Sequence, residues 1–152
     1  MENNKVAERA LSVLPHVKKY VSSAKLPSTV TSASIKELCS DPLAPAKIAF
    51  FASVAAVLEP FLTKYQTSAP LMPFLYDDLM TLLRSVMTRY VKKDILEKAK
   101  TGRDLSKIDV LSKDIRCGSK EVDVGVAATK LLSDSKVSDA AKMAFRMQSI
   151  EF

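Results

Sequence analysis

The fold is decided by the stretch IAFFASVAAVLEPFL, which runs from Ile48 to Leu62. In it and just beyond, apolar side chains recur at spacings of three and four residues, at Ile48, Phe51, Ala55, Leu58, Leu62 and Tyr65. That spacing is typical of one side of an α-helix, and Phe50, Val54, Val57 and Phe61 leave the helix little polar surface. We therefore predict a central helix over residues 45–66, which Pro60 bends near its end.

The same stretch is short for a membrane span. It covers about fifteen residues and includes Glu59 and Pro60, whereas a helix that crosses a bilayer needs roughly 20 residues. We expect a buried core helix and no membrane partner.

Helical spacing continues on both sides of the central helix. The second long helix is predicted over residues 72–92, with Asp77 and Asp78 in its first turn, where carboxylates suit the helix dipole. Shorter helices are predicted at 4–23, with Pro15 inside, and at 34–40, 121–133 and 137–147, with a polar turn or helix tail at 94–100. Alternation from Lys107 to Leu111 predicts one short strand. The expected fold is all-α, an irregular bundle of five to six helices.

Length and composition limit the function classes. The chain has 152 residues, which predicts a single helical domain over 1–152, with loop boundaries near 26–33 and 101–119. Only three glycines are present, too few for a phosphate-cradling loop or a Rossmann turn. One histidine and two cysteines do not complete a zinc site, and we expect no metal, no cofactor and no small-molecule substrate. The polar N-terminus and the few cysteines predict an intracellular protein, in the nucleus or cytoplasm.

Five side chains are candidates for catalysis, and each has a plainer interpretation; Cys39 lies in a predicted short apolar helix and is expected to be buried. Asp77 and Asp78 are neighbours on a helix, so their side chains point about 100° apart and do not converge on a metal. His16 has no second histidine or cysteine within a turn. Cys117 follows Arg116, whose charge is expected to lower the thiol pKa if the turn is exposed. We assign no catalytic residue.

Positive charge gathers in one part of the chain. Eight basic residues lie between positions 84 and 107, against Asp94, Glu97 and Asp104; they are Arg84, Arg89, Lys92, Lys93, Lys98, Lys100, Arg103 and Lys107. A patch of this kind is able to follow a phosphate backbone. The alternative is a solvated helix face, because no aromatic side chain is interleaved to stack on bases.

Three stretches resemble a known family. They are Val57–Thr67 followed by Ala69–Leu75, then Val6–Leu11, and finally Ser106–Val110 followed by Glu121–Ala128. In these stretches the chain resembles uncharacterised animal proteins similar to hAT-type transposases. The resemblance implies the helical insertion of a ribonuclease H-like transposase, without the catalytic carboxylates or the zinc-binding DNA reader.

Two hypotheses follow from the sequence. In the first, the chain is a non-catalytic helical domain that associates with proteins or binds nucleic-acid backbones weakly and without sequence preference. In the second, it is a protein interaction or self-association module, or a truncated relic, whose apolar helices dock on another surface. The second hypothesis predicts exposed apolar patches.

Overall fold

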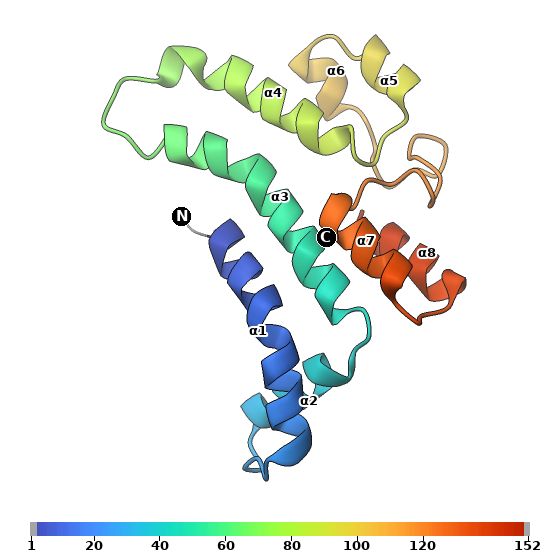
Figure 1. Ribbon diagram of the computed structural model, residues 1–152. Helices are drawn as coiled ribbons and strands as arrows, with labels where there is room; N and C mark the ends of the chain where they lie inside the picture. The colour runs from blue at the N-terminus through green and yellow to red at the C-terminus, as the bar shows by residue number, and fades with distance from the viewer. Residues whose placement is uncertain (1–2, 151–152) are drawn as a thin grey trace. The chain divides into compact units, whose positions relative to one another are not determined.

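The computed structural model describes residues 3–150, and within them the regular structure is helical. The helices are α1 (Asn3–Ser23), α2 (Val30–Ser40), α3 (Ala44–Lys64), the 3-10 turn η1 (Met72–Phe74), α4 (Leu75–Met87), α5 (Lys93–Lys98), α6 (Gly102–Ser106), α7 (Val126–Asp134) and α8 (Asp139–Gln148). The predicted all-α class is confirmed (Figure 1). The eight α-helices of the described residues exceed the five or six predicted.

The extra helices have local causes. Thr101 begins α6 with a capping box: its side chain accepts from Asp104 N, and the Asp104 carboxylate accepts from Thr101 N. Such a box satisfies two backbone N–H groups and separates α6 from α5. The helix predicted at 72–92 begins as η1, continues as α4 and ends at Met87, so residues 88–92 are not helical, contrary to the prediction.

Two other boundaries differ from the prediction for equally local reasons. α2 begins four residues early, because the Thr29 hydroxyl accepts from Ser32 N at 3.2 Å. α7 begins at Val126 and not at 121, directly after Gly125, whose φ of 88° suits a residue without a Cβ.

The described residues form two compact units, one comprising 3–53 and 125–138, the other 54–124 and 139–150. The division therefore falls inside α3, between Ser53 and Val54. The predicted loop at 26–33 belongs wholly to the first unit, and the one at 101–119 wholly to the second.

The central helix exists as predicted, but its inward face differs. Phe50 is buried, whereas Phe51, which belongs to the predicted seam, is 41% exposed. A helix that is apolar around its circumference gives periodicity no contrast, so spacing does not decide which of two adjacent phenylalanines faces inward. At 21 residues α3 is also long and apolar enough to cross a membrane by length and composition, a weak indication because core helices pass the same test.

The core of the second unit joins the end of α4 to α5 and α6. Its buried members are Met87, Val91, Leu96, Ala99 and Leu105. Ile108 and Val110 pack against this cluster from an irregular segment, so the strand predicted at Lys107–Leu111 is wrong. The alternation there reflects two inward apolar side chains without a neighbouring strand.

Backbone hydrogen bonds hold the segment after α6 against the end of α4. Lys92 N donates to Ile115 O at 3.0 Å, and Cys117 N donates to Tyr90 O at 2.7 Å. Together with Asp123 N to Arg89 O at 3.0 Å, these bonds make a backbone strap between residues 89–92 and 115–123. Arg146 of α8 donates from Nη1 to Val122 O at 2.6 Å, which attaches the last helix to the same strap.

Candidate interaction surfaces

Arg84, the first of the eight predicted basic residues, is used inside the fold. Its guanidinium lies in the last turn of α4 and donates to Leu96 O at 3.1 Å and to Ala99 O. These carbonyls belong to the end of α5, where a helix has no internal donors left. The Arg84 guanidinium therefore caps the C-terminal end of α5 and presents little charge to solvent.

Arg89 is also internal. Its side chain is 8% exposed, and Nε donates to Asp123 O at 3.1 Å while lying 3.7 Å from Asp123 Oδ2. Sequence reasoning cannot separate such an arginine from a surface cation, because the partner is 34 residues away. Arg84 and Arg89 are therefore both bonded within the fold.

The two lysines that follow have partners of their own. Lys92 donates from Nζ to Asp114 O at 2.8 Å. Lys93 lies 3.8 Å from Glu97 across one turn of α5, with both side chains well exposed. An exposed pair of this kind contributes little to stability, but it offsets the charge of Lys93 locally.

Six of the predicted basic residues are exposed, and we call the four without a partner described above the cationic surface: Lys98, Lys100, Arg103 and Lys107. All four are exposed, and none forms an ion pair with another side chain of residues 3–150. The nearby carboxylate of Asp104 is held by Thr101, whose hydrogen bonds lower the pKa of Asp104. This surface begins at the end of α5 and continues over α6 (Figure 1).

Cys117 does not have the environment that its neighbour Arg116 suggests. Partial burial and the charge of Glu121 raise the pKa of the Cys117 thiol. The expectation of a lowered thiol pKa is therefore wrong, since desolvation and a nearby carboxylate both disfavour a thiolate. Cys39 and Cys117 are both free, and residues 3–150 contain no cluster of three or more side chains suited to a metal ion.

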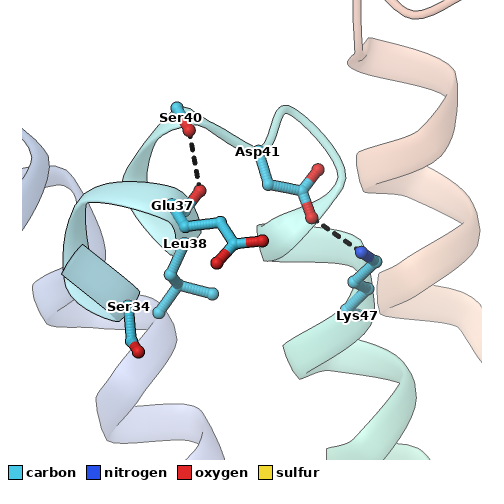
Figure 2. Close-up of a pocket in the computed structure, with 6 residues that line it drawn as sticks. All are labelled: Ser34, Glu37, Leu38, Ser40, Asp41 and Lys47. Atoms are coloured by element: carbon cyan, nitrogen blue, oxygen red, sulfur yellow. Dashed lines mark hydrogen bonds and ion pairs between the residues drawn. The ribbon is translucent and has the colours of Figure 1, made fainter. Parts of the chain in front are cut away.

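A shallow hollow of about 400 Å³ lies between the end of α2 and the start of α3. Figure 2 shows Asp41 paired with Lys47 on one side, at 2.7 Å, and the Ser40 hydroxyl donating to Glu37 O on the other. Partial burial opposes ionisation of Asp41, but hydrogen bonds from Lys47 Nζ and Leu43 N lower its pKa. The polar groups at this hollow thus join two helices.

The Asp78 carboxylate stabilises the turn between α3 and α4. Asp78 Oδ2 accepts hydrogen bonds from Lys64 Nζ and, at 2.8 Å, from the Tyr65 hydroxyl. The Lys64 ammonium also lies 5.7 Å from the centre of the Phe74 ring, within the range of a cation–π contact. The turn is therefore held by polar contacts, while Met72 and Phe74 remain 74% and 55% exposed.

The Asp78 contacts predict an unusual tyrosine titration. Burial, then the hydrogen bond to Asp78, raises the pKa of Tyr65 to about 12. With Asp78→Asn the Tyr65 pKa is expected to fall but to stay above about 10, the ordinary value, because burial persists. NMR titration, with Tyr65→Phe to assign the signal, measures the change.

The raised pKa of Tyr65 also makes the free energy of unfolding depend on pH. A group whose pKa rises on folding stabilises the fold fully below its unfolded pKa, and that contribution is lost as the pH rises through the folded pKa. For Tyr65 this window lies between about 10 and about 12. An Asp78→Asn protein with an unchanged Tyr65 pKa would contradict the assigned hydrogen bond.

Comparison with known proteins matched this chain to no family model, no curated protein and no solved structure.

Proposed function

We propose that this chain is a non-catalytic helical domain, derived from a transposase-like protein, that binds the phosphate backbone of nucleic acid without reading its sequence. The observation that supports the proposal is the cationic surface, which places four exposed cations without ion-pair partners in the described chain within ten residues. Contacts between cations and phosphates supply affinity that is independent of sequence.

The cationic surface contains four of the eight basic residues counted in the sequence. Arg84 and Arg89 donate to carbonyl groups of their own chain, and one carboxylate, that of Asp104, lies among the four remaining cations. If each of the four cations neutralises one phosphate, the slope of log affinity against log salt concentration is about −3.6. Binding is therefore weak and sensitive to salt.

The experiment measures fluorescence anisotropy of labelled duplexes of about 20 base pairs, in two unrelated sequences, between about 50 and 200 mM salt. We expect both duplexes to bind alike and to lose roughly 100-fold in affinity over that range. A protein with Lys98, Lys100, Arg103 and Lys107 all changed to alanine should lose most of the affinity and of the salt slope.

A matched control removes the same charge elsewhere, by changing Lys25, Lys36, Lys130 and Lys136, all exposed, to alanine. The control should keep the affinity within a few-fold of the unchanged protein. The proposal fails if no binding occurs at the lowest salt, or if both variants weaken binding equally, since net charge would then account for the affinity.

Association with another protein is the second candidate function. Exposed large apolar side chains favour it, on α1 and around the turn between α3 and α4: Val6, Val13, Tyr20, Met72, Phe74 and Leu79. Single exposed apolar residues are ordinary on a soluble protein, whereas groups of them mark interaction surfaces.

A further inference from the structure

The outer side of α1 carries an apolar strip that is separate from its buried side. Val6, Val13 and Tyr20 are 64%, 43% and 61% exposed. They recur every seven residues, so at 100° per residue they lie within a sector of about 40°. The buried side of the same helix is formed by Ala7 and Leu14. We call Val6, Val13 and Tyr20 the α1 strip.

The spacing of the α1 strip is that of a paired helix. With the half-buried Ala10 and Val17 between its members, apolar residues follow one another at four, three, four and three positions. This is the pattern by which two helices interlock side chains along a common seam. A strip of this spacing fits the side of another helix better than it fits an extended segment, whose side chains alternate with a period of two.

Charge on the outward edge of the strip defines the partner. At 100° per residue, Arg9 and His16 lie within about 40° of Tyr20 on that edge, both are exposed, and Arg9 forms no ion pair with a side chain of residues 3–150. Lys19 and Glu8 both lie farther round the helix, about 100° and 120° from Tyr20, and the Glu8 carboxylate accepts from Asn4 Nδ2 at 3.3 Å. Two copies of α1 would bring like charges together, which disfavours self-pairing.

We propose that the α1 strip docks an amphipathic α-helix of another protein, whose apolar seam is flanked by Asp or Glu that face Arg9. The inference rests on protein association, the second candidate function, and names its surface and its partner. Apolar side chains between the two helices supply affinity, and the acidic flank selects the partner.

The test uses the full chain and a labelled synthetic peptide of about three heptads, with leucine at the a and d positions and glutamate at e and g. Repulsion between the glutamates opposes self-pairing of the peptide at neutral pH. We expect the peptide to bind more tightly than a scrambled peptide or one with lysine at e and g. The combined change Val13→Ser and Tyr20→Ser should weaken binding by at least about tenfold, while circular dichroism confirms folding.

Charge reversal tests the edge separately. Arg9→Glu should weaken binding of the glutamate peptide by about threefold and strengthen binding of the lysine peptide. Lys130→Glu, the same charge change at an exposed residue of α7, should change both by less. Equal effects of the two reversals would contradict a role for Arg9.

Two further outcomes overturn the proposal. If the peptide binds but Val13→Ser with Tyr20→Ser leaves binding unchanged, association occurs on another surface, so the α1 site fails while the second candidate function stands. If only vesicles of anionic phospholipid bind, and the same double change abolishes that binding, the strip is a lipid-binding surface and not a helix dock.

Discussion

Replacing Leu105 by alanine is expected to lower the free energy of unfolding by about 3 kcal/mol. Leu105 is 1% exposed and is one of the largest fully buried side chains of the described residues. It belongs to the cluster that holds α5 and α6 to the end of α4. Because both short helices depend on tertiary contacts for their stability, the cavity left by alanine affects all three elements.

The measurement is urea unfolding followed by circular dichroism, since the chain has no tryptophan. The loss should appear in the transition that unfolds residues 54–124, which belong to one compact unit. Leu111→Ala is the control: this leucine is 57% exposed, and the change should cost less than about 0.5 kcal/mol. Similar losses in both variants would show that Leu105 does not support the cluster.

Replacing Arg89 by methionine is expected to cost about 2 to 3 kcal/mol, because the hydrogen bond from a buried, charged guanidinium to the Asp123 carbonyl is lost. Methionine retains the length and apolar stem of arginine, so the loss reports the polar contacts and not a cavity. One of these contacts is the hydrogen bond to Asp123 O, which joins the backbone strap to the end of α4. Urea unfolding again measures the change.

Asp123→Asn separates two of the contacts of Arg89, the one to the Asp123 carbonyl and the one to its carboxylate. It keeps the main-chain carbonyl and removes the carboxylate charge, which is 61% exposed. A solvated carboxylate contributes little, and we expect a loss below about 1 kcal/mol. If Asp123→Asn costs as much as Arg89→Met, the ion pair and not the carbonyl holds the strap. In either case, weaker DNA binding by an Arg89 variant would reflect a change in the fold, because Arg89 is not part of the cationic surface.

The long helices could be predicted from sequence because their patterns are strong. The spacing from Ile48 to Tyr65 and the acidic first turn at Asp77 placed α3 and α4 within a few residues. The predictions that failed concern positions that the sequence pattern does not distinguish from one another. Neighbours such as Phe50 and Phe51 have equal hydrophobicity, so only the packed structure shows which is buried. The predicted strand near Ile108 failed because alternation records inward side chains whether or not a second strand is present.

The candidate surface was predictable only in part. Counting charges located the region between Arg84 and Lys107, and six of its eight cations are exposed. The count could not show that Arg84 and Arg89 bond to main-chain carbonyls, because those carbonyls come from α5 and from Asp123. A main-chain acceptor leaves no mark in the sequence, since every residue carries one. The exposure of the α1 strip likewise depends on which side of α1 the rest of its unit covers.

The backbone strap has a consequence for how this protein can change over evolutionary time. Its bonds at Tyr90, Lys92, Ile115 and Cys117 join main-chain atoms to main-chain atoms, and nearly every amino acid supplies both groups. Side chains of the segment 107–124 that face outward can therefore be substituted without changing the backbone conformation of the segment. Selection on this segment acts on the few inward positions, such as Ile108 and Val110, so distant relatives would share this shape with little shared sequence.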